Sequence, residues 1–423
     1  MSQLKPIQYR RAIEALRSGV PNADAVRVLG CNQPMVAGRF DQQLVDCQAG
    51  IASGRQARGE LIMGGFGTGK SHLLEYLEHR ALAQQFVCSR VVISKETPLY
   101  DTAKVFRAAT ETAQVPGITG QAIQEIALRL TPGTSAFEEF SRWANQSGAG
   151  ISPIFPASLR LHESLRNDPE LVEQITDFWA GERLAASKVK QGLARIGGKG
   201  WYDVKPVKVA QLASERMTFM SRLIIGAGFN GWAVLIDEVE LIGRYGLQQR
   251  GRAYAELARW LGRIKSEQYP GLVVVAAITD DFSAAVIEKH GKNDQDRVPE
   301  AIQHKGTDEA VTLAMWAESG MRTIRRDAIA LETPTDDHLR ATYNLLKGVH
   351  AAAYTWSPPD IPAAERQVRR AMRSHVRRWI NEWDLKRLYP GSAVTTEEQQ
   401  IGPTYDEDTD IGKFESEDDE IEP

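Results

Sequence analysis

The sequence predicts an α/β fold, in which helices flank a parallel β-sheet, and three observations lead to this prediction. Short apolar runs alternate with stretches of helical periodicity at 61–113 and again from 231 onward. A glycine-rich loop joins the first apolar run to the helix that follows it. A later apolar run, 232–236, ends directly in Asp237-Glu238. These features predict strands whose carboxyl ends meet around one site.

Length and composition set the limits of this prediction. A chain of 423 residues exceeds what one compact core usually holds, so we expect two or three structural units. The first residues lack the apolar core of a secretion signal, and no stretch reaches 18 uninterrupted apolar residues, so we expect a cytoplasmic protein without membrane contact. Three scattered cysteines without metal-ligand spacing, Cys31, Cys47 and Cys88, are predicted to be reduced thiols.

The N-terminal helical segment, 1–53, reads as a helix, a turn and a short helix over 5–30, followed by a third helix over 33–52. A helix-turn-helix DNA reader is one interpretation. The other interpretation is an element that packs against the predicted α/β domain. We favour packing, because the second helix is short and poor in side chains that read bases.

The glycine-rich loop carries the full pattern G-x-x-x-x-G-K-[ST] between a strand and a helix. Glycines let the backbone wrap an anion, Lys70 carries positive charge to the β- and γ-phosphates, and the Ser71 hydroxyl can hold Mg²⁺. The helix dipole also favours phosphate. The pattern predicts a P-loop NTPase that binds ATP with Mg²⁺. The predicted binding residues are Gly64, Gly65, Phe66, Gly67, Thr68, Gly69, Lys70, Ser71 and His72.

A second strand over 87–94 and a helix over 101–113 complete the first part of the ATPase core, 54–114. Residues 115–215 then break the rhythm, because proline, glycine and serine separate helical pieces at 120–130, 136–145 and 169–189. This region is predicted to be a mostly helical insertion, and its glycine-rich exit at 196–200 is predicted to be a turn.

The sheet pattern returns in the second part of the core, 216–315. Strands are predicted at 232–236 and 272–278, with a helix at 247–264 between them. A further helix is predicted at 284–290, and the last strand at 310–314. Residues 316–390 are predicted to form a C-terminal helical domain, or lid.

Three residues at strand ends are the catalytic candidates besides Lys70. Asp237 is predicted to hold Mg²⁺, and Glu238 to orient or deprotonate the attacking water. Thr279, at the end of the next strand, is placed to sense the γ-phosphate or to hold the water.

An arginine that reaches the γ-phosphate of a neighbouring copy in a homo-oligomer must lie beyond that strand or on an interface. Arg297, in a predicted loop over 293–299, is the first candidate, and Arg244 and Arg250 are the alternatives.

Five arginines recur at helical spacing and fall on a single stripe of one predicted helix. They are Arg366, Arg369, Arg370, Arg373 and Arg377. Such a stripe should meet something anionic, namely a DNA or RNA backbone, the bound nucleotide, the acidic tail or acidic side chains of the body. A solvated face with local salt bridges is the alternative. One of these arginines is also a candidate for a lid residue that touches the γ-phosphate. On another face of this helix, Val368, Met372, Val376, Trp379 and Trp383 are predicted to be core.

The tail, 391–423, is predicted to be acidic and disordered. From Glu397 onward it has 12 acidic residues and one lysine, which leaves 50 basic and 43 acidic residues in the body. Because its carboxylates can mimic a phosphate backbone, the tail over 397–423 is expected to compete with an anionic partner for the positive body. A solubility tail, or a docking peptide for a basic partner, is the alternative.

The P-loop, the helical insertion, the segment 231–261 and the ending 376–390 (VRRWINEWDLKRLYP) together resemble the ATP-binding proteins of BREX-type bacterial phage-defence systems. The resemblance covers most of 5–390. It implies an AAA+-like fold similar to the origin-recognition ATPases, with a Rossmann-like base and a helical lid. It also implies a role beside a helicase or modification enzyme in a defence operon. Lys70 and Asp237 lie far apart for AAA+ proteins, and the insertion accounts for that departure.

Three functional classes follow. The first is an ATPase that acts on DNA or remodels a DNA-bound defence complex. The second is a nucleotide-gated switch that binds a protein partner and hydrolyses little. A P-loop kinase is disfavoured, because no second phosphate-acceptor site stands out.

Overall fold

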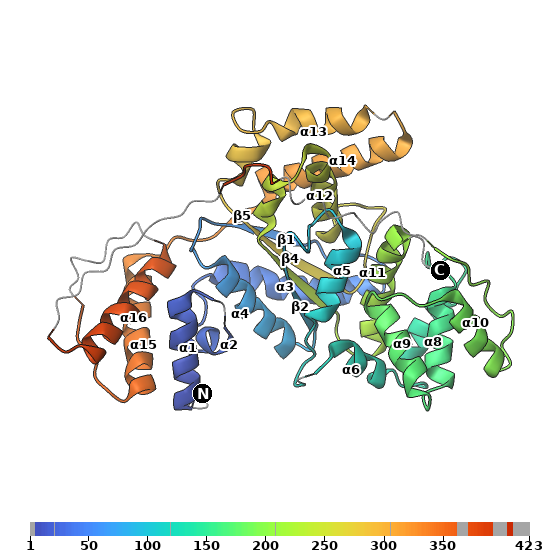
Figure 1. Cartoon of the computed structure of the whole chain (residues 1–423), viewed down its shortest axis with the longest axis horizontal. Coiled ribbons are helices and arrows are strands. Elements are labelled where there is room, and N and C mark those ends of the chain that lie inside the picture. The colour runs from blue at the N-terminus through green and yellow to red at the C-terminus, as the bar shows by residue number, and fades with distance from the viewer. Residues whose placement is uncertain are drawn as a thin grey trace.

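In the computed structural model a central sheet carries helices on both faces, with helical groups at either end (Figure 1). The structure describes residues 5–20, 22–118, 120–207, 209–304, 306–361, 371–391 and 404–408. Among these described residues no helix is long and apolar enough to cross a membrane.

The sheet has five parallel strands in the order β2-β3-β4-β1-β5. Their bounds are Glu60–Met63 (β1), Val87–Val92 (β2), Trp232–Asp237 (β3), Leu272–Ile278 (β4) and Ile329–Ala330 (β5). Every residue of β3 and β4 is buried, as expected for strands covered on both faces. The strands predicted at 232–236 and 272–278 are therefore confirmed.

Alternate residues of the strands face two different hydrophobic clusters. Ile62 and Leu235 pack with the helices α3 (Pro34–Ile51) and α4 (Lys70–Ala83). Leu61 and Val234 belong to the cluster on the opposite face. The helices of that face are α5 (Thr102–Glu111), α11 (Val209–Gly226) and α12 (Leu247–Trp260).

The chain leaves β1 and its neighbour β4 toward opposite faces of the sheet, because β1 leads into α4 and β4 into elements of the other cluster. Such a switch point opens a crevice at the carboxyl ends of the strands, where α/β proteins bind ligands.

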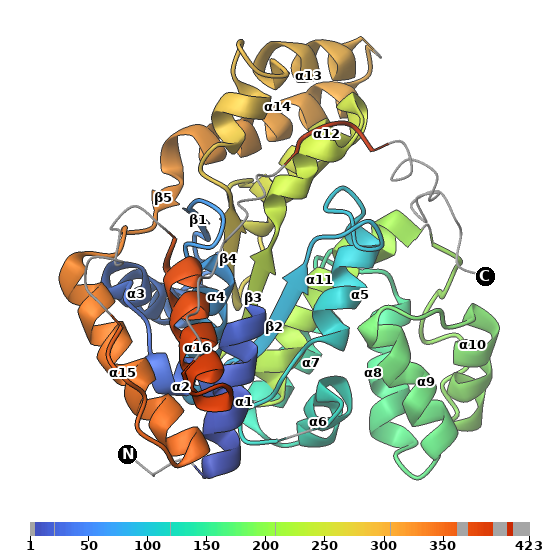
Figure 2. The ribbon, with the colours of Figure 1, turned by 60° about the vertical axis from the view of Figure 1, so that its left-hand side comes forward.

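The predicted insertion consists of helices in the structure (Figure 2). They are α6 (Ala122–Arg129), α7 (Ser135–Ala144), α8 (Ile154–Ser164), α9 (Pro169–Ala180) and α10 (Ala186–Arg195). The single helix expected over 169–189 is two helices, because Gly181, at φ +124°, ends α9. Trp179 and Phe219 are among the aromatic residues that join this group to α11, with ring centroids 5.6 Å apart.

The prediction of a last strand at 310–314 is wrong, because this segment lies in α14 (Asp308–Arg322). The Thr307 side chain caps this helix by accepting from the Ala310 N–H at 3.2 Å, and two acids occupy its first turn. In place of the helix expected at 284–290 there is a π-turn, η2 (Ser283–Ile287). The remaining elements of this region are η1 (Val239–Arg244), α13 (Asp294–Gln303) and η3 (Thr323–Asp327).

Helices from the two ends of the chain form one unit beside α4. They are α1 (Pro6–Ser18), α2 (Ala23–Leu29), α15 (Asp336–Tyr354) and α16 (Met372–Leu388). Ile13 shares a core with Leu346, Trp379 and Trp383, all of them buried, and α2 packs against α4 and α15. The predicted burial of Val376, Trp379 and Trp383 is confirmed, and Val368 lies outside the described residues.

Candidate nucleotide-binding site

The glycine-rich loop lies between β1 and α4, which begins at Lys70, as the motif requires. Gly67 and Gly69 have φ angles of +76° and +103°, a region that glycine adopts without strain. The Gly64 N–H donates to the Ile278 carbonyl at 3.2 Å and so ties the loop to β4. The N-terminus of α4, with its unpaired first N–H groups, opens at this point.

Lys70 is buried, and its ammonium group is held across the loop. Nζ donates to the carbonyl oxygens of Gly64 at 2.7 Å and Gly65 at 3.3 Å, and it lies 4.0 Å from Glu240 Oε1. An anion that enters the loop would therefore exchange these neutral partners for a charged one, which makes a stronger hydrogen bond.

The end of β3 carries the two predicted acids. Asp237 is buried, and its Oδ1 accepts from the Glu238 N–H at 3.0 Å. Glu238 has a left-handed backbone with φ +60°, which is strained for a residue with a side chain, and its side chain lines the cavity described below. Desolvation and the nearby Asp237 raise the pKa of Glu238, while Lys70 and Arg373 act in the opposite direction.

Glu240 is a site residue that the sequence analysis missed. It is buried on η1, and its Oε2 has no hydrogen-bond partner among the described residues. Burial raises its pKa to about 7, although Lys70 lowers it. The only sequence signal was the second acid in the run Asp237-Glu238-Val239-Glu240, which has no fixed place in the general motif.

Arg373 brings the helical unit to the loop. Its backbone N–H donates to the Gly67 carbonyl at 3.2 Å, and its guanidinium lies 5.5 Å from the centroid of the Phe66 ring. On the other side it lies so close to Gly19 that a Cβ there would fall 2.3 Å from Arg373 Nε. Of the predicted arginine stripe, Arg373 reaches the loop and Arg377 lies one turn further along α16. Arg366, Arg369 and Arg370 lie outside the described residues.

A cavity of about 200 Å³ opens between the loop and the helical unit. One wall consists of 66–73 with Glu238 and Glu240. The other consists of 29–33 and of residues on α1, α15 and α16. His72 links the walls, since its Nε2 lies 2.8 Å from the Gly30 carbonyl and burial lowers its pKa, which favours the neutral ring.

Ser71 lines the cavity, and the buried Asp237 is the last residue of β3. Among the described residues no group of three or more His, Cys, Asp or Glu side chains could hold a metal by itself. This set fits Mg²⁺, which binds through one or two protein oxygens and takes its other ligands from phosphate and water.

Thr279 is buried at the end of β4, and its hydroxyl lies 2.7 Å from the Tyr405 hydroxyl of the tail. Its neighbour Asp280, which the sequence analysis did not select, is next to the phosphate loop. A Cβ on Gly65 would lie 3.5 Å from Asp280 Oδ2.

None of the three arginines proposed for a neighbouring copy lines the cavity. Arg297 lies exposed on α13, and the prediction that it belongs to a loop is wrong. Arg250 is 1% exposed and makes a two-pronged ion pair with Asp294 at 2.8 and 2.9 Å, which is a structural role. Arg244 pairs with Asp408 at 3.4 Å.

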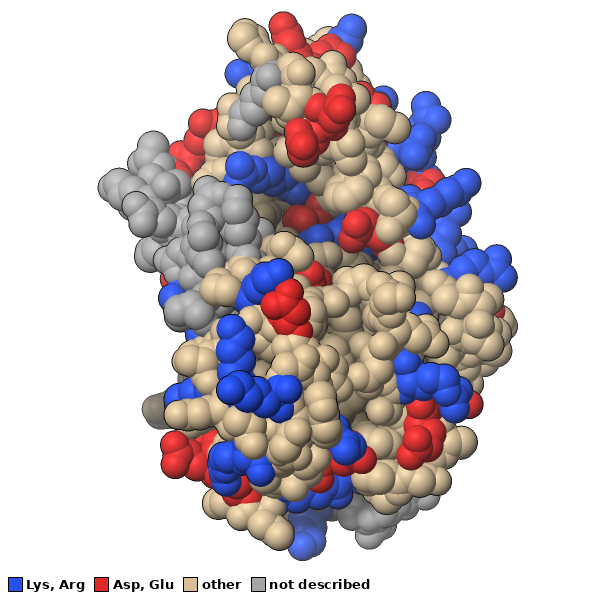
Figure 3. Space-filling view, turned by 90° about the vertical axis from the view of Figure 1, so that its right-hand side faces the viewer, with Lys and Arg blue, Asp and Glu red and all other residues tan. Residues whose placement is uncertain are grey.

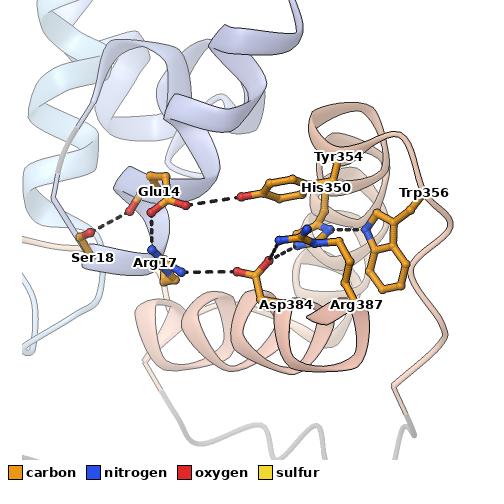
Figure 4. A network of polar contacts seen from close by, with 8 residues as sticks. All are labelled: Glu14, Arg17, Ser18, His350, Tyr354, Trp356, Asp384 and Arg387. Carbon is orange, nitrogen blue, oxygen red and sulfur yellow. Dashed lines mark hydrogen bonds and ion pairs between the residues drawn. The ribbon is translucent and has the colours of Figure 1, made fainter. Parts of the chain in front are cut away.

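A polar network fastens α1 to α15 and α16 (Figure 4). Asp384 lies 3.1 Å from His350 Nε2, 3.4 Å from Arg387 and 3.7 Å from Arg17 of α1. Because Trp356 donates to His350 Nδ1 at 2.9 Å, the Nε2 atom carries the proton and donates to Asp384. Burial would raise the pKa of Asp384, but His350 and Arg387 hold it below its usual range.

A sequence model of the family described as BREX system ATP-binding protein BrxC/D matches residues 5–128 and 209–382, which is most of the chain. No curated protein and no solved structure matches the chain. The matched residues include the phosphate loop, the ends of β3 and β4, and Arg373, whereas α7 to α10 lie in the unmatched part. The match confirms the family resemblance found in the sequence.

Proposed function

The chain belongs to this family of BREX system ATP-binding proteins, and on that premise we propose that its cavity binds ATP with Mg²⁺ and that the end of β3 supports hydrolysis. Membership implies a role in a BREX phage-defence system. One observation carries the proposal: Lys70 and Glu238 line the same cavity, at the carboxyl edge of a parallel sheet.

Each residue of the loop wall has a role in this proposal. Lys70 leaves the loop carbonyls and binds the β- and γ-phosphates, together with the N-terminus of α4. Ser71 and Asp237 would hold Mg²⁺, which neutralises charge on the phosphates when bound. Glu238 orients the water and accepts its proton, and its raised pKa brings it closer to the pH at which a base is effective.

The helical wall supplies the rest of the site. Leu29, His338 and Val376 line its part of the cavity and form a surface that suits the adenine base. Arg373 stands at the loop end of this wall, where its guanidinium can reach a phosphate. In this proposal Arg373 is the lid arginine anticipated from the sequence.

The Glu238→Gln variant tests the hydrolytic half of the proposal. We expect ATP affinity within about threefold of wild type and turnover reduced by about 100-fold or more, because the carboxylate acts on the water and not on the nucleotide. Calorimetric titration measures binding, and steady-state phosphate release measures turnover. Glu318→Gln, at an exposed site on α14, is the matched control. Wild-type turnover in Glu238→Gln would remove this residue from the mechanism.

The surrounding system suggests what the ATPase acts on. We propose that it remodels or loads a DNA-associated complex together with a helicase or modification enzyme of the same defence system. The body carries an excess of basic residues, but on the face in Figure 3 they are interspersed with acidic ones. DNA binding therefore requires a direct test, which is ATP hydrolysis with and without duplex and single-stranded DNA. Mass measurement in ATP tests homo-oligomer formation.

A nucleotide-gated switch with little intrinsic hydrolysis is the second candidate. It is favoured by Thr279, whose hydroxyl is hydrogen-bonded to Tyr405 of the tail. Wild-type protein that binds ATP but does not hydrolyse it, with DNA and partners present, would establish the switch.

A further inference from the structure

A short piece of the acidic tail lies against the carboxyl edge of the sheet. The Tyr405 ring packs edge-on against Phe282, with centroids 5.7 Å apart. Its hydroxyl donates to Asp281 Oδ1 at 2.8 Å and lies 2.7 Å from Thr279 Oγ1. The tyrosine therefore binds at the end of β4, and residues 404–408 differ from the expectation of a disordered tail.

The next residues of this segment meet basic side chains. Glu407 accepts from Arg250 Nη1 at 2.8 Å, and Asp408 lies 2.7 Å from Lys95 Nζ. The Asp408 N–H also donates to the Arg244 carbonyl at 3.0 Å. Arg250 lowers the pKa of Glu407, as expected for a carboxylate bonded to a guanidinium. The contacts involve backbone, charge and aromatic packing within five residues of tail.

Gly243 shapes the surface that receives the tyrosine. A Cβ at this position would fall 2.6 Å from Tyr405 Cδ1, so any side chain on Gly243 would collide with the docked ring. Its φ is not in the left-handed region, so the backbone itself does not require glycine. Gly243 lies on η1, the same turn whose Glu240 faces Lys70. The docked segment and the phosphate loop thus lie against a common element.

We propose that the surface formed by Lys95, Gly243, Arg244, Arg250 and Phe282 is a docking site for a short acidic segment that carries a tyrosine. Its occupant is 404–408 of the same chain. Attachment to the chain supplies an effective concentration of about 1 mM, so a weak peptide site suffices to hold the segment. Docking fixes the Thr279 hydroxyl and so slows turnover, a consequence that rests on the proposed ATPase function, whereas the docking itself does not.

Hydrogen exchange of full-length protein without nucleotide tests the docking. Tyr405→Ala and Gly243→Ala should each release the segment and raise the exchange of 279–283 and of 404–408 by about tenfold or more. Gly246→Ala is the matched control, because a Cβ there meets its nearest atom at an ordinary 3.6 Å. Wild-type exchange in both Tyr405→Ala and Gly243→Ala would overturn the proposal.

A labelled peptide with the sequence of residues 402–410 provides a second test. The peptide should bind full-length Tyr405→Ala, because the tail of that variant no longer covers the docking surface. It should bind Gly243→Ala at least about tenfold more weakly. Affinity should fall with salt, because ion pairs contribute to it. Equal binding to the two variants, or no binding to either, would overturn the assignment of this surface as the docking site.

The rate of ATP hydrolysis tests whether docking restrains Thr279, separately from whether the segment docks. In a preparation that hydrolyses ATP, Tyr405→Ala and Gly243→Ala should both exceed wild type, with Gly246→Ala unchanged. Released tails with wild-type turnover would overturn the restraint of Thr279 and leave the docking site in place. A preparation with no hydrolysis at all would count against the proposed ATPase, and the exchange and peptide measurements would still decide the docking.

Discussion

The two walls of the cavity are built in opposite ways. Most of the loop wall comes from consecutive residues, 66–73, which lie between β1 and the first turn of α4, and Glu238 and Glu240 join it from the turn after β3. The helical wall joins α1 to α15 and α16, which are more than 300 residues away, through a shared core and the polar network around Asp384. The first wall adjoins β3 and β4, every residue of which is buried. The second depends on contacts that only the completed chain can make.

This difference predicts how substitutions in each of the two walls affect the protein. A change in the loop wall removes a contact to the nucleotide itself. A change in the helical wall alters how well the cavity is closed, and its effect on affinity should be smaller, while its effect on stability should be local to the helical unit.

The largest effect is expected for Lys70→Ala. Because Lys70 would contact two phosphates with a full charge, its removal should lower ATP affinity by about 100-fold. Fluorescent-ATP titration measures the loss, with Lys190→Ala on α10 as an exposed control far from the loop. Unchanged affinity in a folded Lys70→Ala protein would refute the assignment of the loop wall.

Arg373→Ala should be the most damaging single change in the helical wall. The loss of one charged contact to phosphate predicts about a tenfold lower affinity for ATP. AMP, which lacks the β- and γ-phosphates, should lose much less. Arg377→Ala, one turn away on the same helix and outside the cavity lining, is the matched control. Equal losses in the two variants would mean that the stripe acts through its overall charge.

Asp384→Asn sharpens the comparison, because it changes no residue that lines the cavity and weakens only the connection of α1 to α15 and α16 within the helical wall. Loss of a buried charge that holds His350, Arg17 and Arg387 should destabilise the helical unit by about 1 to 3 kcal/mol. Hydrogen exchange should rise in α1, α15 and α16 and stay unchanged in the sheet, with ATP affinity about threefold lower. Asp337→Asn, whose side chain is 90% exposed, is the control. Faster exchange in β3 and β4 would contradict the division into two walls.

The smallest effect is expected for Glu240→Gln and depends on pH. Because burial raises the pKa of Glu240 to about 7 in the folded protein, from 4.5 in the unfolded chain, the folded state binds the extra proton between these values. Its favourable contribution is complete below pH 4.5 and is lost as the pH rises through 7. Nucleotide-free Glu240→Gln should therefore melt at a higher temperature than wild type at pH 8, with the difference shrinking toward pH 5. Glu318→Gln is again the control, and a pH-independent difference would exclude this explanation.

The loop wall could be predicted from the sequence because its signals are local. The motif 64–71, the runs that became β3 and β4, and the acids at 237–238 each lie in a few consecutive residues. The helical wall could not, since nothing near Gly19 indicates that Arg373 will lie against it. The predictions of short elements failed for the same reason. The two-residue β5 has no periodicity of its own, and the apolar segment at 310–314 lies in a helix that is capped by Thr307. The docked tyrosine is a further case, because composition predicted disorder while aromatic, hydrogen-bond and ionic contacts hold 404–408.

The position of α1 has a consequence for biosynthesis. Residues 6–18 leave the ribosome long before their packing partners in α15 and α16 are translated. The strands from β1 to β4 can assemble while the chain is still growing, whereas the apolar face around Ile13 has to wait. A nascent or prematurely terminated chain would carry the phosphate loop without the wall that closes over it. The closed cavity would then arise only in chains translated as far as Leu388.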